Sequence, residues 1–305
     1  MYISRNFPAR ISDNFQGSIF MIAAMAGFAC NDLLIKGIGG SLSIGQIVLF
    51  RGIIATSLVL FLCVRTRQLY KVRRLSPLIL VRALAEATAT YCFLQALFAI
   101  PITELSAVMQ ALPLVITVGA ALFLGERVGW RRLVAIGIGF IGVFLIIRPG
   151  FSGFSIYSVY ALAAVLACAV RDLVTRRLAG DVPSLVVTLV TTVLVTALGG
   201  VLALGQPWHP VAAEKIGLLA IASIFIVIGY HFAVAAMRVG EIGFVSPFRY
   251  TMLLFTAAGG ALFYGEIPDY LTIVGACIVI LTGIYTIFRE RYANRQSVIP
   301  APTRQ

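Results

Sequence analysis

Several ionisable side chains stand inside long apolar stretches of this chain, and they carry most of the chemistry that the sequence offers. A charge within an apolar span is costly, so each such residue is by default a candidate for a functional site. Carboxylates and guanidinium groups there are suited to ion pairing and anion binding, and a histidine is suited to proton transfer. The candidates are Asp32, Arg51, Arg82, Glu86, Arg171, Asp172, His231 and Arg249.

Asp32 and Arg51 form the first candidate group. Each lies roughly six or seven residues from the same end of its apolar stretch, so at about 1.5 Å of rise per residue the two side chains have matching depth. Two interpretations stay open: a salt bridge that locks the two helices together, or a gating or coupling role in transport.

The second group combines three arginines with two carboxylates. Arg82 and Glu86 stand four residues apart, so we expect them to share one helix face and to pair. Arg171 and Asp172 are adjacent in another stretch, where a gating or coupling role is also open, and Arg249 lies in a third. Because one cation is left over, an anionic or electron-rich group of a ligand is expected to balance it.

Arg249 is the strongest candidate for binding such a ligand. A planar guanidinium can hold a carboxylate or stack on a heterocycle, and the flanking Phe248 and Tyr250 offer aromatic faces. The alternative is that Arg249 pairs with Asp172 or Glu86 and only stabilises the fold.

His231 is a further candidate, because the charge of a histidine changes near physiological pH. A proton-coupling role and a role as a hydrogen-bonded packing residue both stay open. The internal repeat described below matches His231 with Tyr91, which joins the candidates for substrate binding.

The sequence offers little to an enzyme or to a metal site. His209 and His231 belong to no histidine cluster, and neither a GxSxG motif nor a phosphate-binding loop ending in Gly-Lys occurs. No cofactor is expected. The cysteines fall in apolar stretches without CxxC spacing and are expected to be small buried thiols. They are Cys30, Cys63, Cys92, Cys168 and Cys277. An intramembrane serine–histidine enzyme and an ion channel stay as alternatives from other classes.

Apolar helices must position these residues, because the composition excludes a soluble domain. Of 305 residues 60% are hydrophobic and 12% charged, with a mean hydropathy of +0.98, whereas a soluble domain has about a quarter of its residues charged. A bilayer core of about 30 Å needs about 20 apolar residues in a helix. Ten such stretches run approximately over 17–36, 44–64, 77–98, 102–124, 131–148, 155–178, 184–205, 215–237, 241–264 and 268–288.

The basic residues indicate an orientation for these stretches. The net charge is +12, but the cations cluster between apolar spans, so we interpret them as topology signals and not as a nucleic-acid-binding surface. Outside the spans, seventeen lysines and arginines fall on the side of the N-terminus and three, Lys36, Arg148 and Lys215, on the other. This asymmetry predicts cytoplasmic termini and an even number of spans.

The second half of the chain repeats the first at a constant offset. Residues 121–126 read ALFLGE and residues 261–266 read ALFYGE, and the same offset matches Asp32 with Asp172. Each half holds five spans, an odd number, so the halves are expected in opposite orientations. Inverted repeats are typical of secondary transporters, which bind substrate near the membrane midplane between the repeats.

Prolines and glycines predict local geometry within the spans. Pro113 and Pro247 each remove a helical hydrogen bond and can bend their helices. Gly137, Gly139 and Gly142 permit close helix approach, within the chain or in a homodimer.

The pattern resembles a known family. Ten spans in two halves, each with Gly-Glu after its fourth helix, resemble the EamA-type members of the drug/metabolite transporter superfamily over residues 17 to about 288. Within it, Asn31-Asp32 with Lys36, Phe50-Arg51, Arg82 and Pro247-Phe248-Arg249-Tyr250 resemble the branch of S-adenosylmethionine and riboflavin uptake carriers. The resemblance implies a carrier without ATP hydrolysis, with a central cavity lined mainly by spans 1, 3, 4, 6, 8 and 9.

The sequence therefore predicts an all-α polytopic protein of the cytoplasmic membrane, with ten transmembrane helices in two inverted five-helix repeats. The repeats are expected over 17–148 and 155–288, between cytoplasmic tails at 1–16 and 289–305. The expected partners are the lipid bilayer and a small vitamin-like or nucleoside-like substrate. Export of amino acids, drugs or other metabolites is the alternative direction.

Overall fold

The structure is a computed structural model that describes residues 11–67, 76–125, 129–148, 155–177, 184–240 and 242–298. Across these ranges the chain is almost entirely helical, with no β-strand beyond an isolated bridge between Gly39 and Leu42. The prediction of an all-α protein is confirmed. The helices are α1 (Ile11–Ile38), α2 (Ile44–Arg65), α3 (Pro77–Ala99), α4 (Ile102–Met109), α5 (Leu112–Phe123), α6 (Trp130–Ile147), α7 (Ile156–Arg177), α8 (Ser184–Leu204), α9 (Ala213–Val239), α10 (Ile242–Val245), the 3-10 helix η2 (Ser246–Tyr250), α11 (Thr251–Tyr264) and α12 (Tyr270–Val298).

Eight helical segments in the described part of the chain are long and apolar enough to cross a bilayer, counting α4 and α5 together as one. The two other predicted stretches fall short of that length for different reasons. The apolar part of α6 is shorter, Leu133–Ile147, and residues 242–264 are divided among α10, η2 and α11.

Two helices extend beyond the predicted apolar stretches. α1 begins at Ile11, before the predicted 17, and α12 continues to Val298, beyond the predicted 288. The prediction followed apolar content alone, whereas a helix keeps its own backbone hydrogen bonds after the chain becomes polar. Both predicted tails therefore contain helix, and their cytoplasmic location stays a prediction.

Polar side chains cap the starts of α2 and α3. Ser43 and Gln46 form a reciprocal capping box at the start of α2. Ser76 caps α3, and Pro77 follows at a position where its missing N–H costs no hydrogen bond.

Proline breaks two of the predicted spans. α4 ends at Met109, and α5 begins at Leu112 with Pro113 in its first turn. Pro247 lies at the start of η2, the single 3-10 turn between α10 and α11. The predicted effect of both prolines is confirmed, and the second break places Arg249 in η2 and not in a regular helix.

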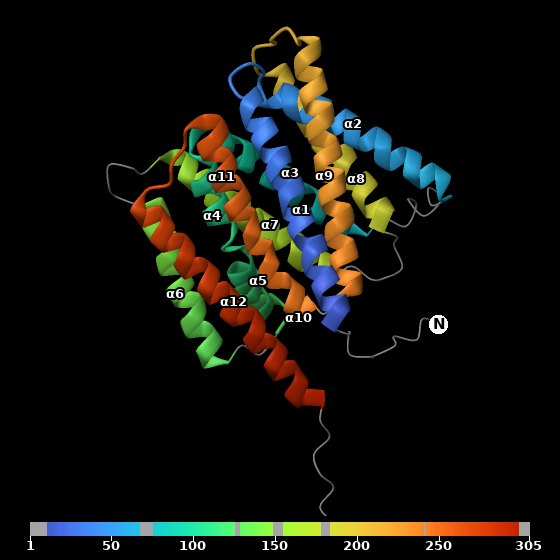
Figure 1. Ribbon diagram of the computed structural model, residues 1–305. Coiled ribbons are helices and arrows are strands. Elements are labelled where there is room, and N and C mark those ends of the chain that lie inside the picture. The colour runs from blue at the N-terminus through green and yellow to red at the C-terminus, as the bar shows by residue number, and fades with distance from the viewer. Residues whose placement is uncertain are drawn as a thin grey trace, which may run out of the picture.

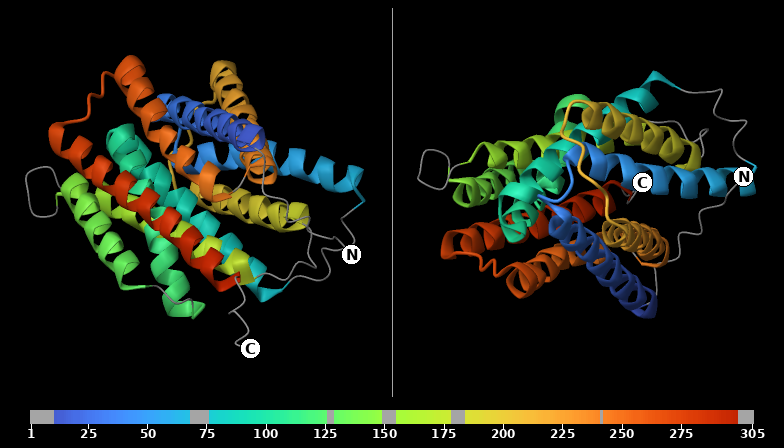
Figure 2. Two further views of the ribbon diagram at one scale, coloured as in Figure 1. Left: turned by 60° about the horizontal axis from the view of Figure 1, so that its bottom comes forward. Right: turned by 90° about the horizontal axis from the view of Figure 1, so that it is seen from above.

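The long helices pack in pairs. α1 lies along α9, α3 along α7, α2 along α8 and α6 along α12, and the α1–α9 and α6–α12 pairs are visible side by side in Figures 1 and 2. Close contact in the last pair uses glycine: a Cβ on Gly142 would lie 2.8 Å from the carbonyl oxygen of Gly275. Gly139 is equally tight against Leu114, as predicted, but Gly137 has open space beside it and makes no close approach.

The packing follows the offset of the two halves. The Oγ1 atoms of Thr56 on α2 and Thr196 on α8 are 3.1 Å apart, and their positions differ by 140 residues, the offset of the repeat. Under the same offset the α1–α9 pair corresponds to the α7–α3 pair, which is also packed. Glu126, in the first copy of the repeated six-residue block, lies outside the described residues.

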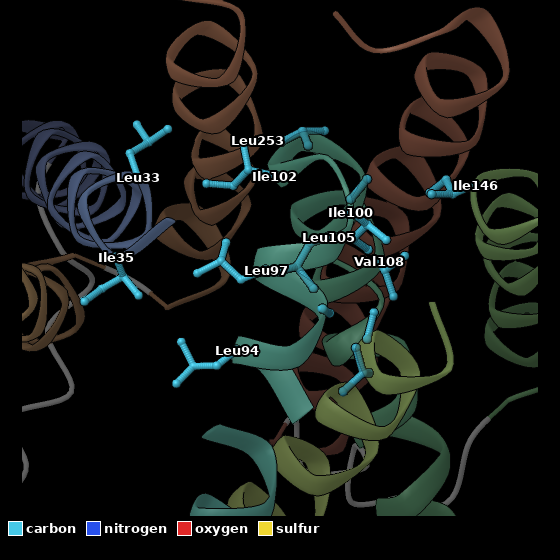
Figure 3. Close-up of a cluster of buried hydrophobic side chains, with 14 of the residues drawn as sticks. Leu33, Ile35, Leu94, Leu97, Ile100, Ile102, Leu105, Val108, Ile146 and Leu253 are labelled. Carbon is cyan, nitrogen blue, oxygen red and sulfur yellow. The ribbon is translucent and has the colours of Figure 1, made fainter. Parts of the chain in front are cut away.

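A buried apolar cluster holds the ends of α1, α3 and α4 together near α6 and α11. It includes Leu33, Ile35, Leu94, Leu97, Ile102, Leu105, Val108, Ile146 and Leu253. Figure 3 shows these side chains converging from the different helices. The cluster fixes one end of α3, and the charged residues lie farther along the same helix toward its start.

Candidate functional site

A polar stripe follows the contact between α3 and α7. Arg171 on α7 lies between two carboxylates: its Nη1 is 3.0 Å from Oε2 of Glu86 on α3, and its Nε is 2.7 Å from Oδ1 of Asp172. Each side chain keeps part of its surface exposed. These three residues, the Arg171 network, thus form one connected set of charges with a net charge of −1.

Arg82 joins the stripe in a different way from the one predicted. It donates from Nε to Oγ1 of Thr175 on α7 (3.0 Å) and from Nη1 to Oγ1 of Thr191 on α8 (2.6 Å). The expected Arg82–Glu86 pair is therefore wrong. Spacing of four residues brings two side chains to one face, but Glu86 has a cationic partner on the neighbouring helix, and Arg82 reaches two hydroxyl groups instead.

Arg249, in η2, lies near the Arg171 network without joining it. Its guanidinium is within electrostatic range of Asp172 and Arg171, yet it makes no hydrogen bond or ion pair with any residue that the structure describes. Its side chain is exposed. The guanidinium of Arg249 is therefore left accessible beside α7. The alternative of a direct Arg249 pair with Asp172 or Glu86 is not formed, because Arg171 holds both carboxylates.

The two aromatic neighbours of Arg249 are less exposed than Arg249 itself. Tyr250 is buried, and its hydroxyl packs against Gly283 of α12, where no side chain would fit. Phe248 is half-buried and contacts Phe244 and the apolar residues of α1. Of the three adjacent candidates, Arg249 alone is exposed.

α9 contributes a residue that the pattern of charges does not reveal. Tyr230 is 55% exposed, and its hydroxyl lies within electrostatic range of Glu86, Arg171 and Arg51, on three different helices. His231, the predicted candidate beside it, is not brought to this cluster. It shares a face with the exposed Ile224 and Ile228, seven and three residues before it. Tyr230 carries no charge, so a search for charged residues within spans does not find it.

Tyr91 continues the stripe toward the far end of α3. It accepts a hydrogen bond of 2.8 Å from Nε2 of Gln95 and makes an edge-on ring contact with Tyr160 of α7, at 6.2 Å between centroids. Tyr157 contacts the same ring of Tyr160. The stripe therefore changes from charged to aromatic along the α3–α7 contact.

Asp32 and Arg51 are near each other but not in direct contact. Asp32 is buried and accepts a hydrogen bond of 2.8 Å from its neighbour Asn31. Arg51 attracts it over a longer distance, without an ion pair between them in the described residues. The interpretation as a locking salt bridge is therefore not supported by the contact it requires.

A second ionic network closes one end of the helix bundle. Nζ of Lys36, at the end of α1, is 2.7 Å from Oε1 of Glu266, which follows α11. Lys36 also donates to the carbonyl of Ile100, and the N–H of Ile102 donates to Oε2 of Glu266, each at 2.8 Å. This Lys36–Glu266 network joins α1, the α3–α4 junction and the end of α11. The count of basic residues places Lys36 outside the spans, whereas it lies in the last turn of α1.

Arg148 and Asp269 form a more exposed pair at the same end. Asp269 caps α12 and hydrogen-bonds the guanidinium of Arg148. The hydrogen bonds from Arg148 and Thr272 lower the pKa of the Asp269 carboxyl to about 2, so the pair stays charged at physiological pH. Among the described residues, no three His, Cys, Asp or Glu side chains are grouped to hold a metal ion.

Known proteins match nearly the whole chain. The model of the EamA-like transporter family matches residues 15–148 and again residues 155–289. A riboflavin transporter of Rhizobium johnstonii is 27% identical over 217 residues, 71% of this chain and 72% of that protein. A solved crystal structure matches with a TM-score of 0.62 at 18% identity, over 92% of this chain and 98% of that one, so the two share a fold.

Other similar proteins carry different transport names. A pseudopaline exporter, CntI, of Pseudomonas aeruginosa is 27% identical over 282 residues, 88% of this chain and 94% of that protein. An S-adenosylmethionine uptake transporter of Rickettsia felis is 23% identical over 276 residues, 90% of this chain and 93% of that protein.

Proposed function

Because the chain belongs to the EamA-like transporter family, and is thus a multi-pass membrane transporter and not an enzyme, we propose that it moves a small organic metabolite across the cytoplasmic membrane by alternating access. The cargo is vitamin-like or nucleoside-like, with riboflavin and S-adenosylmethionine as the compounds to test first. Both compounds appear in the names of transporters that are similar to this chain.

The proposed architecture is ten membrane spans in two inverted halves, with both termini in the cytoplasm. The pairing of α1 with α9 and of α7 with α3 supports it, since the offset of the repeat exchanges these pairs. The Thr56–Thr196 contact supports a two-fold axis between α2 and α8. The excess of basic residues on the side of the N-terminus supports the orientation.

The exposed Arg249 is the observation on which the proposed binding site rests. Arg171 is neutralised by Glu86 and Asp172, and Arg82 is held by two threonines. Of these three cations, Arg249 is the one that is exposed and that has no hydrogen bond or ion pair with a described residue. The carboxylate of S-adenosylmethionine would give it the charge-assisted, two-pronged partner that a guanidinium prefers. Riboflavin has no carboxylate or phosphate, and its planar ring would instead stack on the guanidinium.

The Lys36–Glu266 network supplies a means of closing one end during the transport cycle. It joins Lys36 of the first half to Glu266 of the second, so it must break when the halves move apart there. Cargo then reaches Arg249 from one side at a time, which is the requirement of alternating access. Asp32 and Arg51, and the Arg171 network, are the proposed gating or coupling groups.

The experiment that tests the function is uptake of labelled riboflavin and S-adenosylmethionine by cells that cannot import either compound. Saturable uptake with the wild type, and its loss in Arg249→Ala at equal membrane expression, is the expected result. Absence of uptake of both compounds by a correctly inserted wild type would contradict an importer of this class.

Export is the second candidate, because a relative that covers most of this chain is named as an exporter. Inside-out membrane vesicles distinguish the two directions. Accumulation of a compound in such vesicles, together with its failure to enter whole cells, would identify an exporter. A homodimer is compatible with this proposal but is not required by it.

A further inference from the structure

Tyr230 is the exposed residue near the charged network that the proposed function has not yet used. A tyrosine in a membrane protein normally places its hydroxyl at the membrane–water interface or gives it a hydrogen-bond partner. Tyr230 lies well inside α9 and is 55% exposed, yet its hydroxyl makes no hydrogen bond with any described residue. The ring is therefore not held through its hydroxyl by any described residue, and its exposed surface is available to a ligand.

The ring of Tyr230 points toward the charged residues and away from lipid. The exposed Ile224 and Ile228 mark the outer, apolar face of α9. At about 100° of rotation per residue, Tyr230 is turned about 120° and 160° from these two positions. Glu86, Arg171 and Arg51 all act electrostatically on its hydroxyl, so α3, α7 and α2 converge on the same space.

Phe28 of α1 fixes the orientation of this ring. The two rings make an edge-to-face contact, with centroids 5.2 Å apart and planes at 74°. Phe28 rests on Gly229, where a Cβ would lie 2.6 Å from two atoms of its ring. An edge-to-face contact covers at most one face of each ring. Because Tyr230 is also 55% exposed, part of its ring surface stays open.

We propose that the open face of Tyr230 stacks on a planar heteroaromatic ring of the cargo, while Arg249 holds an acidic group of the same molecule. Phe28, whose ring contacts Tyr230, packs against the same buried apolar cluster as Phe248, the neighbour of Arg249. Tyr230 and Arg249 therefore lie on the same side of the bundle, and each is within electrostatic range of Arg171. The inference rests on the proposed function and narrows it: the cargo combines a flat ring with a carboxylate or phosphate. Tyr230 selects the ring, and Arg249 selects the charge.

The test uses three compounds that separate the two groups. S-adenosylmethionine has a ring and a carboxylate, adenosine has the ring without the carboxylate, and methionine has the carboxylate without the ring. Their binding is measured on the full-length protein purified in lipid nanodiscs. The variants are Tyr230→Leu, Tyr230→Phe and Arg249→Ala, with Tyr270→Leu as the matched control, since Tyr270 is an exposed tyrosine at the start of α12.

The expected result is a double dissociation. Tyr230→Leu weakens the binding of S-adenosylmethionine and adenosine by about tenfold, within the range known for loss of stacking on an aromatic side chain, and leaves methionine unchanged. Arg249→Ala weakens S-adenosylmethionine and methionine and leaves adenosine unchanged. Tyr230→Phe keeps the ring and stays within about twofold of wild type, because stacking needs no hydroxyl. Tyr270→Leu has no effect.

Two results would overturn the proposal. One is that Tyr230→Leu binds S-adenosylmethionine and adenosine as tightly as wild type does. The other is that wild type binds neither of these two ring compounds. Transport into proteoliposomes separates this failure from that of the proposed function. If wild type moves a compound and Tyr230→Leu moves it equally well, the stacking role is wrong and the transporter stands. If wild type binds these compounds and moves none of them, the proposed function is wrong.

Discussion

Asp32 on α1 and Asp172 on α7 occupy matched positions in the two halves of the chain, but their surroundings differ. Asp32 is buried and accepts a hydrogen bond from the preceding Asn31. Asp172 is partly exposed and is bound by the preceding Arg171, which also holds Glu86 on another helix. The preceding residue also differs: it is Asn31 in the first half and Arg171 in the second.

The comparison shows how a duplicated scaffold can hold an asymmetric cargo. Two of the cations have apolar counterparts in the other half, since the repeat matches Arg249 with Met109 and Arg82 with Ala222. The cations therefore gather near Asp172 and not near its counterpart Asp32. We infer that the Asp172 side contacts the cargo and that the Asp32 side mainly supports it.

Removing Arg171 is the strongest way to test the asymmetry. Arg171→Ala leaves two carboxylates without their cation inside a membrane protein, and breaking a buried pair in this way costs about 3–5 kcal/mol, less where water reaches it. We expect loss of transport and a lower melting temperature in detergent.

The triple variant Arg171→Ala, Glu86→Gln, Asp172→Asn is the control for that result. It removes the uncompensated charges, so the melting temperature should recover while transport stays low. Recovery of both would show that the Arg171 network only stabilises the fold.

Matched substitutions of the two aspartates sharpen the comparison directly. Asp172→Asn should reduce transport by about tenfold, equivalent to about 1.4 kcal/mol, because it removes a charge that Arg171 and Arg249 both sense. Asp32→Asn should stay within about threefold, since an amide oxygen can still accept the hydrogen bond from Asn31. Initial rates over a range of cargo concentrations measure both. An equal loss of transport in the two variants would show that the two aspartates have equivalent roles.

The Lys36–Glu266 network links the two halves at the end of the bundle. Lys36→Met or Glu266→Gln should weaken closure at that end and reduce the rate of transport several-fold. The effect on cargo affinity should be smaller, because the contacts of Lys36 and Glu266 do not involve Arg249. Accessibility of a cysteine placed at Ser41, which is half-buried in the turn after α1, should rise. Unchanged accessibility in both variants would contradict a closing role.

His231 should have the smallest effect. It lies on the exposed face of α9 with Ile224 and Ile228, away from the charged network, so His231→Gln is expected to leave both the rate of transport and its dependence on pH unchanged. The pH profile of uptake between about pH 5.5 and 8 (the range in which histidine titrates) is the measurement. A shifted profile would return His231 to the candidates for proton coupling.

Much of the fold was predictable from the sequence because lipid imposes simple rules. Apolar length located most of the helices. Pro113 and Pro247 marked the two breaks, since a proline that follows a helical segment removes a hydrogen bond that would continue it. Polar ends were less predictable, because α1 and α12 continue as helices after the apolar stretch ends.

The sequence predicted which residues belong to the candidate site better than it predicted which of them contact one another. A charge in a span is costly, which identified Arg171, Glu86 and Arg249 as candidates. Which groups meet depends on the packing of neighbouring helices, and there the local rule of four-residue spacing failed for Arg82. Tyr230 carries no charge and gave no such signal.

The most direct test of the central claim is the concentration dependence of transport by Arg249 variants in proteoliposomes. Arg249→Ala should raise the KM for a transported compound by at least about tenfold, Arg249→Lys should fall between Ala and wild type because it keeps the charge without the planar fork, and Arg131→Ala, at an exposed arginine on α6, should match wild type. An Arg249→Ala protein with unchanged KM and unchanged maximal rate would show that the cargo does not bind there.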